Sequence, residues 1–264
     1  MSDTAPVAAS EASVFSADQY ADNYPAGIEN HYWALARGWI VADALKEARR
    51  AGLWNGPDAI LEIGCGPGVV VRQLRAQGFD AWGVELGRPA VMPEVASHIR
   101  VGQDANALEA AFRERTGAIL LLDVIEHIAE PEAFLAKIAA SFPNCRVFIV
   151  TVPARQEVWS NYDAHYGHHR RYDRPLLARS LRAAGLEPLR LRYFFRPLYP
   201  AALFFTLTRR PRPVVWRSPA HPRLHNAFAR VLYGVERLLR PFAVLPGLSL
   251  LAIAAAGGRR DPRQ

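Results

Sequence analysis

The sequence predicts an α/β fold built on a mostly parallel β-sheet with helices on both faces. Short apolar runs alternate along the chain with helical segments of about ten residues, a pattern typical of βαβ units. The predicted strand cores, AILEI, AILLL and RVFIVTV, are continuously apolar, as strands covered on both faces are. Half of the 264 residues are apolar and 22% are charged, so the chain can bury a large core.

The first half of the sheet is predicted from apolar segments that glycines separate. Residues 28–51 carry apolar side chains at a period close to 3.6 and end before Gly52, which indicates a helix. A short buried strand then follows Pro57, and Gly78 ends the next helix. In chain order we expect helix 28–51, strand 59–63, helix 69–77, strand 79–84, helix 89–97, strand 99–102 and helix 108–115.

The second half repeats this alternation and then changes character. We expect strand 118–122, helix 131–140, strand 146–152, helix 175–184 and strand 189–194. From 196 to 246 prolines cluster among arginines and aromatics, and residues 224–239 have the period of an amphipathic helix. This stretch is interpreted as an insertion before a last buried strand over 248–256.

The ends of the chain and its two cysteines set limits on the class of protein. Residues 1–16 are small and polar and lack the pattern of a secretory signal, so we expect a disordered arm. No apolar run reaches the ~18 residues needed to cross a bilayer. Cys65 and Cys145 lie far apart and imply no disulfide framework, which fits a reducing cytosol. A cytoplasmic protein is therefore expected.

The net charge of +7 is unevenly distributed. From residue 185 onward there are fourteen arginines and three acids, whereas the first 184 residues are slightly acidic. Such asymmetry suggests a polyanion or an anionic membrane surface, although a merely solvated tail is an equal alternative. For residues 194–240 we rank contact with the inner face of a membrane first and an oligomer contact second. Nucleic acid comes last because no recognised module is present.

A glycine-rich run follows the first predicted strand and opens a helix. In LEIGCGPG, residues 61–68, glycines let the backbone turn tightly and approach a ligand. Glu85 comes 21 residues after Gly64, where its carboxylate can accept hydrogen bonds from both ribose hydroxyls. Asp104 follows the third strand, within reach of an adenine ring. The run predicts a nucleoside site, the alternative being a turn without a ligand.

Two details argue against a dinucleotide as that ligand. Val69 stands where the dinucleotide fingerprint has its third glycine. Glu62 would repel a pyrophosphate but could interact with a cationic amino acid or a sulfonium.

The runs ILEIGCGPG, GVELG and LLLDVIEHIAEP resemble the class I S-adenosylmethionine-dependent methyltransferases, in the branch of the ubiquinone-biosynthesis O-methyltransferases and bacterial enzymes of unassigned substrate. The resemblance is strong over about Ala59–Val152 and looser over 159–193. It implies a Rossmann-like, seven-stranded sheet whose last two strands form an antiparallel hairpin. It also implies S-adenosyl-L-methionine as the cofactor, bound by Glu62, Gly64, Cys65, Gly66, Gly68, Glu85, Leu86, Asp104, Ala105 and, near the sulfonium, Asp123.

Three polar residues follow the fourth predicted strand: Asp123, Glu126 and His127. Their i, i+3, i+4 spacing would place them on one face of a helical turn at the ligand-binding edge of the sheet. They could orient the loop through backbone hydrogen bonds, or His127 could be a general base. A third alternative is a divalent cation, since certain relatives use an acidic-x-x-Glu-His run for magnesium or zinc.

A second polar segment, residues 158–172, follows the fifth strand and could close over the substrate. It resembles a D-x-x-x-G-H-x-R-R-Y run of some bacterial methyltransferases, which falls on Asp163, Gly167, His168, Arg170, Arg171 and Tyr172. His168 is the first choice for the base. Arg170 and Arg171 could clamp a carboxylate or phosphate of the acceptor, and Tyr166 and Tyr172 could stack on a ring, with Trp159 also on the substrate side. Alternatively, Asp163 pairs with an arginine and the segment is a structural lid.

Together these features predict a methyltransferase of one domain over 17–264. Its expected parts are the N-terminal helix 28–56, the cofactor core 57–152, the lid and sixth strand 153–195, the insertion 196–246 and the last strand 247–257. We expect O-methylation of a small, or lipid- or sugar-linked, acceptor, with His168 or His127 and Asp123 at the reacting centre. The alternatives are a non-catalytic S-adenosylmethionine-binding scaffold and, more remotely, an NAD-dependent oxidoreductase.

Overall fold

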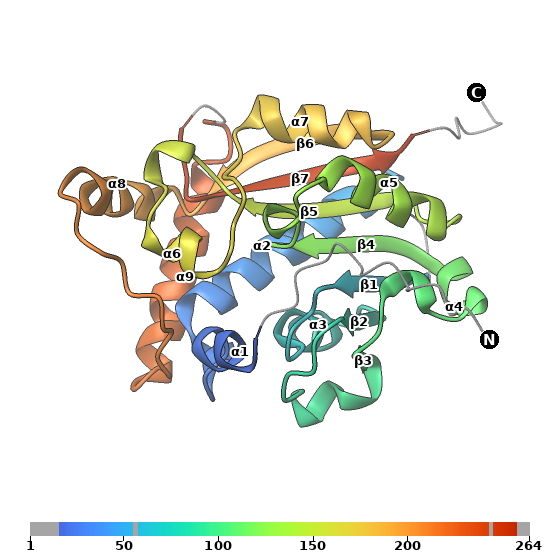
Figure 1. Cartoon of the computed structure of the whole chain (residues 1–264), viewed down its shortest axis with the longest axis horizontal. Helices are drawn as coiled ribbons and strands as arrows, with labels where there is room; N and C mark the ends of the chain where they lie inside the picture. The colour runs from blue at the N-terminus through green and yellow to red at the C-terminus, as the bar shows by residue number, and fades with distance from the viewer. Residues whose placement is uncertain (1–15, 55–57, 243–244, 258–264) are drawn as a thin grey trace, which may run out of the picture.

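The computed structural model describes residues 16–54, 58–242 and 245–257 (Figure 1). The described residues form a seven-stranded sheet of order β3-β2-β1-β4-β5-β7-β6. Strands β1 to β5 run parallel, and β7 pairs antiparallel with both β5 and β6. The predicted Rossmann-like sheet with a final antiparallel hairpin is therefore confirmed. The strands are β1 Ala59–Ile63, β2 Ala81–Glu85, β3 Ile99–Val101, β4 Thr116–Leu122, β5 Val147–Pro153, β6 Leu186–Phe194 and β7 Ser249–Ala256.

Successive residues of the central strands supply two separate cores, because strand side chains alternate between faces. Ile60 and Leu120 face a cluster that includes residues of α2, α3 and α9, whereas Leu61 and Leu121 face α5 and α7. Figure 1 shows helices on both sides of the sheet. The covering helices are α2 Tyr32–Arg50, α3 Val69–Arg75 and α9 Pro222–Leu238 on one face, and α5 Pro131–Ser141 and α7 Arg174–Ala183 on the other.

Several predicted helices are shorter than expected or are interrupted. The segment 89–97 is helical only as a 3₁₀-helix over Pro93–His98, because Pro93 lacks the N–H that a longer helix would need. The segment 108–115 holds only α4, Ala110–Glu114, which follows a 3₁₀ turn at Ala105–Ala107. Three helices were not predicted: α1 Ala17–Asn23, α6 Asn161–His165 and α8 Tyr199–Leu207.

The expected N-terminal arm lies outside the described residues except for Ser16. That residue is the N-cap of α1, where its side chain accepts a hydrogen bond from the Gln19 N–H and the Gln19 side chain bonds back. This capping box fixes the start of α1.

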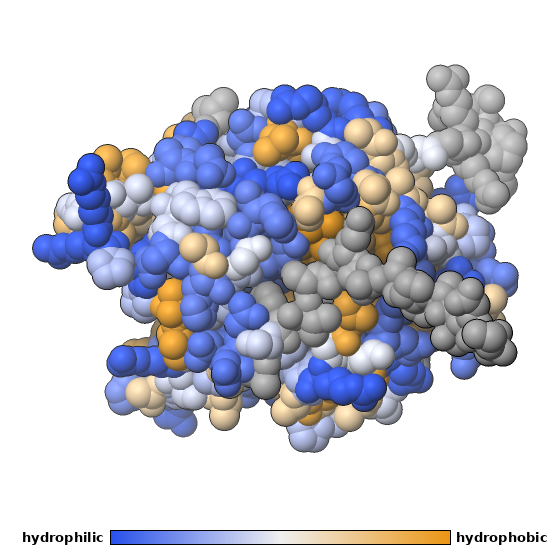
Figure 2. All heavy atoms as spheres, in the orientation of Figure 1, coloured by the Kyte–Doolittle hydropathy of each residue, from blue (hydrophilic) through white to orange (hydrophobic). Residues whose placement is uncertain are grey.

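The insertion between β6 and β7 contains α8 and α9 and is anchored at its base. Glu236 of α9 accepts hydrogen bonds from both the backbone N–H and the guanidinium of Arg196, each at 2.6 Å, and both side chains are buried. Apolar residues reach the surface at the left of Figure 2, where Figure 1 places α8. No helix in the described part of the chain is long and apolar enough to span a bilayer.

Candidate active site

The carboxyl ends of the central strands open on a cavity of about 1000 Å³. The sheet order turns back between β1 and β4, and ligands of open α/β sheets bind at such a point. Three parts of the chain contribute most of the cavity lining: the loops after β1, β2, β3 and β4, the N-terminal helices α1 and α2, and the segment from α6 through the insertion. Of the predicted cofactor residues, those on the lining are Glu62, Gly64, Cys65, Glu85, Leu86, Asp104, Ala105 and Asp123.

The glycine-rich loop has the backbone conformation for which glycine is needed. Gly64, Gly66 and Gly68 all have positive φ angles, between 53° and 94°. Gly66 and Gly68 do not line the cavity: Tyr24 covers Gly66, and Gly68 makes room for Ile99. Their role in this structure is to shape the loop.

Glu85, predicted to bind a ribose, is buried and holds two loops together. Its Oε2 accepts a hydrogen bond from the Gly66 N–H (2.9 Å), and its Oε1 accepts one from the Gly87 N–H (3.0 Å). The hydroxyl of Tyr20 from α1 also donates to Oε1, at 2.8 Å. A Cβ at Gly87 would lie 2.1 Å from that hydroxyl, so α1 packs directly on the loop after β2.

Asp104, which follows β3, also lines the cavity. Its Oδ1 accepts hydrogen bonds from both the backbone and the side-chain nitrogen of Asn106, each at 2.7 Å. Leu86 and Ala105 line the cavity beside it. The predicted adenine end is thus a carboxylate next to apolar side chains.

Arg37 of α2 is a site residue that the sequence analysis missed. Its Nη1 lies 3.2 Å from the Asp123 carboxylate, and its Nη2 donates to the Leu122 carbonyl (2.9 Å). Its Nε is buried without a hydrogen-bond partner among the described residues. Burial raises the pKa of Glu62 to about 8, although the positive charge of Arg37 opposes this shift. The available signal was an arginine within the otherwise apolar run ALARGWIVA.

The predicted common face of Asp123, Glu126 and His127 is not formed. Asp123 has a left-handed backbone (φ 58°), and the following turn, Ile125–His127, is a 3₁₀-helix rather than an α-helix. Asp123 consequently faces Arg37 and accepts a hydrogen bond from the Thr151 hydroxyl (3.1 Å).

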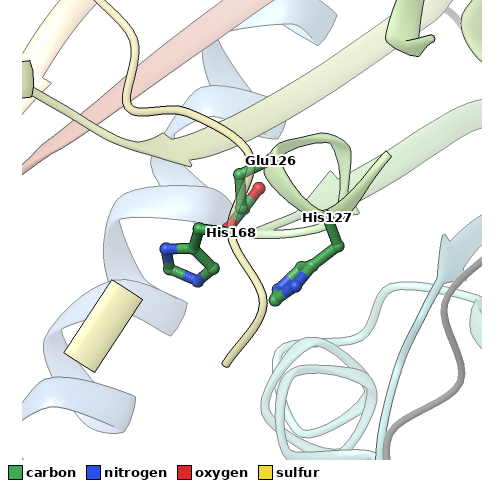
Figure 3. A group of neighbouring side chains, drawn as sticks. All are labelled: Glu126, His127 and His168. Atoms are coloured by element: carbon green, nitrogen blue, oxygen red, sulfur yellow. The ribbon is translucent and has the colours of Figure 1, made fainter. Parts of the chain in front are cut away.

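Glu126 and His127 instead meet His168, which comes from the loop after α6 (Figure 3). One possible metal-ligand atom from each residue lies within 4.8 Å of the others. Both carboxylate oxygens of Glu126 are buried without a hydrogen-bond partner in the described part of the chain, and burial raises the pKa of Glu126. Burial and the adjacent His168 lower the pKa of His127 to about 3, so this imidazole is neutral at neutral pH and is a weak base.

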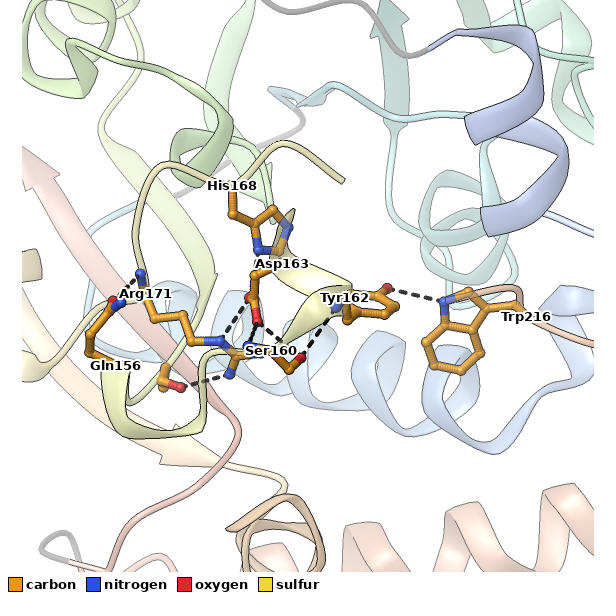
Figure 4. A network of polar contacts seen from close by, with 8 residues as sticks. Gln156, Ser160, Tyr162, Asp163, His168, Arg171 and Trp216 are labelled. Atoms are coloured by element: carbon orange, nitrogen blue, oxygen red, sulfur yellow. Dashed lines mark hydrogen bonds and ion pairs between the residues drawn. The ribbon is translucent and has the colours of Figure 1, made fainter. Parts of the chain in front are cut away.

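His168 is fixed by Asp163, which is fully buried (Figure 4). His168 Nδ1 and Arg171 Nε each lie 2.8 Å from the same Oδ1, while Oδ2 accepts from the Ser160 N–H at 2.9 Å. Burial would raise the pKa of Asp163, but the His168 hydrogen bond and the charge of Arg171 lower it to about 2. Because the ionised carboxylate only accepts, His168 donates from Nδ1, which places the lone pair of a neutral imidazole on Nε2.

The predicted substrate residues of this segment need correction. Arg171 lines the cavity, but its guanidinium is already bound to Asp163 and to the Ala154 carbonyl, so the pair with Arg170 does not form the expected clamp. Arg170 donates to the Ala129 carbonyl and, like Trp159, does not line the cavity. Tyr172 is completely buried in the core, where it cannot stack on a ligand. Tyr166 does line the cavity and donates to the Val214 carbonyl at 2.7 Å.

Residues of the insertion complete the opposite wall and were not predicted as site residues. Arg212 and Trp216 line the cavity, and the Trp216 indole N–H donates to the Tyr162 hydroxyl at 3.1 Å. No local motif marks either residue, because their partners lie about fifty residues earlier in the chain.

Comparison with known proteins identifies the family of the chain. Residues 36–191 match the family described as a methyltransferase domain. A ubiquinone biosynthesis O-methyltransferase of Pectobacterium carotovorum subsp. carotovorum (strain PC1) is 22% identical over 108 residues, which are 38% of this chain and 45% of that protein. Its counterpart from Rickettsia conorii (strain ATCC VR-613 / Malish 7) is 26% identical over 99 residues, 35% of this chain and 34% of that protein. The matched region thus spans less than half the length of these relatives.

Two solved structures share the fold. One is a complex between the Haloferax volcanii Trm112 methyltransferase activator and a methyltransferase, with a TM-score of 0.54, 16% identity, and coverage of 93% of this chain and 100% of the other. The second is phosphoethanolamine N-methyltransferase 2 of Haemonchus contortus in complex with S-adenosyl-L-methionine, with a TM-score of 0.51, 18% identity, and coverage of 93% and 61%.

Proposed function

The chain belongs to the S-adenosylmethionine-dependent methyltransferases, and from this premise we propose that it methylates an oxygen atom of a small, or lipid- or sugar-linked, acceptor. The observation that carries the choice of oxygen is the imidazole of His168, which lines the cavity while Asp163 holds its Nδ1 at 2.8 Å. Transfer to a hydroxyl requires removal of its proton, and an oriented imidazole with a free lone pair can accept it.

The cofactor is proposed to lie along the wall from the glycine-rich loop to Asp104. Glu85 would accept hydrogen bonds from the ribose hydroxyls once Tyr20 releases Oε1. Arg37, whose Nε is buried without a partner, suits the methionine carboxylate, and Glu62 suits the ammonium group. Asp123 would then stand near the sulfonium, and the reaction is an in-line displacement in which the enzyme supplies alignment and a dry pocket.

His168→Ala tests the role of the base. We expect release of S-adenosylhomocysteine to fall about 100-fold or more, while the dissociation constant for S-adenosylmethionine stays unchanged. His169→Ala is the matched control, because His169 is the adjacent histidine and is exposed. The assay combines wild type with a panel of hydroxylated acceptors and detects a +CH₂ product by mass spectrometry. Unchanged turnover in His168→Ala would remove the proposed base.

A second role for the same residues is supported by the unpartnered carboxylate of Glu126. Glu126, His127 and His168 offer a mixed oxygen and nitrogen donor set that suits a first-row divalent cation. The hydrogen bond from His168 to Asp163 has the form of the outer-shell contact that orients metal-bound histidines. Such a cation would act as a Lewis acid on the acceptor oxygen. Dialysis against a chelator separates the two roles, since turnover by a metal-free base survives it and Glu126→Gln would abolish only metal-dependent turnover.

We also propose that the insertion contacts an anionic membrane surface. The large apolar side chains that are exposed in the described residues all lie in it: Phe204, Leu207, Val215, Leu224, Phe228, Val231, Leu238, Phe242 and Leu245. Arginines flank them, and the one acidic residue of 196–246, Glu236, is buried against Arg196. This combination of apolar and basic residues is typical of segments that lie in a membrane interface.

A further inference from the structure

Arg212 presents a cation to the cavity without a counter-ion among the described residues. Its side chain lines the cavity, and its Nη1 is buried without a hydrogen-bond partner. Arg37 and Arg171 also line the cavity, but each is paired with an aspartate. Arg217, a further arginine of this wall, is exposed to solvent. Arg212 is therefore the half-buried guanidinium of this wall that forms no ion pair with the described residues.

Helix α6 holds this arginine in position. The Asn161 side chain bonds to both backbone groups of Arg212, accepting from its N–H and donating to its carbonyl, each at 2.8 Å. The guanidinium carbon lies 5.7 Å from the centre of the Tyr162 ring, and Tyr166 binds the next part of the segment at Val214. The same helix carries Asp163, which fixes His168 (Figure 4). One short helix thus sets the positions of both Arg212 and the candidate base.

An anion would remove an energetic penalty at this position. Burial and the nearby charge of Arg171 lower the pKa of Arg212, and the charge of Asp163 opposes this shift only in part, although an arginine stays protonated in proteins. A cation withdrawn from water without a partner is costly, and a carboxylate or phosphate can satisfy it through two parallel hydrogen bonds. Asp163 does not fill this role, because both of its oxygens are engaged by Ser160, His168 and Arg171.

We propose that Arg212 binds an anionic group of the methyl acceptor, a carboxylate or a phosphate, so that the acceptor hydroxyl is directed toward His168. The substrate class is thereby narrowed to hydroxylated anions. This inference rests on the proposed function for the identity of the acceptor, but the anion site itself does not depend on it. It also assigns to Arg212, a residue of the insertion, the anion-binding role that was predicted for Arg170 and Arg171.

The first experiment uses inorganic phosphate alone. Thermal unfolding of the full chain is compared in phosphate and in chloride at equal ionic strength. We expect phosphate to raise the melting temperature of wild type and of Arg210→Gln, and to have no specific effect on Arg212→Gln. Arg210 is the matched control, because it is an exposed arginine two residues away that does not line the cavity. No phosphate effect on wild type, or an equal effect on Arg212→Gln, would overturn the proposal.

The second experiment measures binding of three probes in the presence of S-adenosylhomocysteine: phenol, 4-hydroxybenzoate and 4-hydroxyphenyl phosphate. Wild type should bind at least one anionic probe about tenfold or more tightly than phenol, and the better one identifies the anion. In Arg212→Gln the ratio should fall to about one, and Arg212→Lys should retain part of it. A ratio that survives Arg212→Gln contradicts the proposal.

The two experiments separate this inference from the proposed function. If Arg212→Gln binds S-adenosylhomocysteine as wild type does but loses anion discrimination, both the cofactor site and the anion site are supported. If wild type does not bind S-adenosylhomocysteine, the cofactor site fails, while the phosphate experiment still decides the role of Arg212.

Discussion

Asp163 shows how one buried carboxylate can organise a site. It caps the start of α6, orients His168 and neutralises Arg171, all within ten residues of chain. A buried pair of this kind is expensive to break, because removing one partner leaves the other charge uncompensated. The structural role and the proposed catalytic role of this segment therefore both depend on Asp163.

Asp163→Asn should destabilise the protein and make its free energy of unfolding depend less on pH in the acid range. The pKa of Asp163 is lowered from 3.8 to about 2, so its contribution is complete above about pH 4 and is lost as the pH falls through 2. The shift corresponds to roughly 2 kcal/mol of unfolding free energy at neutral pH. Urea unfolding at several pH values measures it. Asp80→Asn is the control, since Asp80 forms partly exposed ion pairs with Arg75 and Arg115, which contribute little. Equal losses in the two variants would contradict the role given to Asp163.

At the residue scale, the sequence predicted those positions that depend only on residues nearby in the chain. Glu62, Gly64 and Glu85 lie where they were expected, because the turn after β1 and the end of β2 follow from short apolar runs and glycines. Arg37 and Arg212 were missed because their partners are distant in the chain. The anion clamp predicted for Arg171 is not formed, because the carboxylate of Asp163, eight residues earlier in the chain, already binds this guanidinium.

Among the helices, α1 makes the contacts that bear most directly on the proposed cofactor site. Beyond the bond from Tyr20 to Glu85, Gln19 donates to the His165 carbonyl (3.1 Å) and the Asp22 carbonyl accepts from the Trp216 N–H (2.8 Å). This short helix therefore joins the loop after β2, α6 and the insertion. A ribose that binds Glu85 must compete with the Tyr20 hydroxyl for Oε1.

Tyr20→Phe should consequently bind S-adenosylmethionine more tightly, by about tenfold, because a competing hydrogen bond to a charged group is removed. Isothermal titration calorimetry measures the dissociation constant. Asp18→Asn, an exposed change in the same helix, should leave it unchanged. Weaker binding in Tyr20→Phe would show that the hydroxyl assists the cofactor instead of displacing it.

The strands of the sheet are the elements that the sequence predicted best. All seven strands were predicted within three residues at either end, and continuous apolar runs mark the central strands β1, β4 and β5. Helices α1 and α6 were missed because they are only seven and five residues long and are mostly polar. Their positions depend on tertiary contacts with other parts of the cavity wall, and such contacts leave no periodic pattern in the local sequence.

At the scale of the whole molecule, the insertion has two surfaces of different composition. Its inner side supplies Arg212 and Trp216 to the cavity, and its outer side carries the exposed apolar residues of α8 and α9. Leu224, Phe228 and Val231 lie along one exposed stripe of α9, while Ala229 and Leu232 are buried on the face toward α2. An acceptor with a lipid chain would therefore reach the cavity through the part of the chain proposed to meet the membrane.

Replacing Leu224, Phe228 and Val231 together by glutamate should abolish binding to vesicles of phosphatidylglycerol and phosphatidylcholine while leaving S-adenosylmethionine binding intact. The change removes buried apolar area and opposes the anionic surface, and raised salt should weaken the binding of wild type by screening the arginines. Co-sedimentation with vesicles measures the bound fraction. The control is Ala133, Ala136 and Ala140 replaced by glutamate, an equal charge on the exposed face of α5 across the sheet. Wild type that ignores anionic vesicles but sediments as a dimer, which the α9 variant dissociates, would assign the stripe to a second copy of the chain.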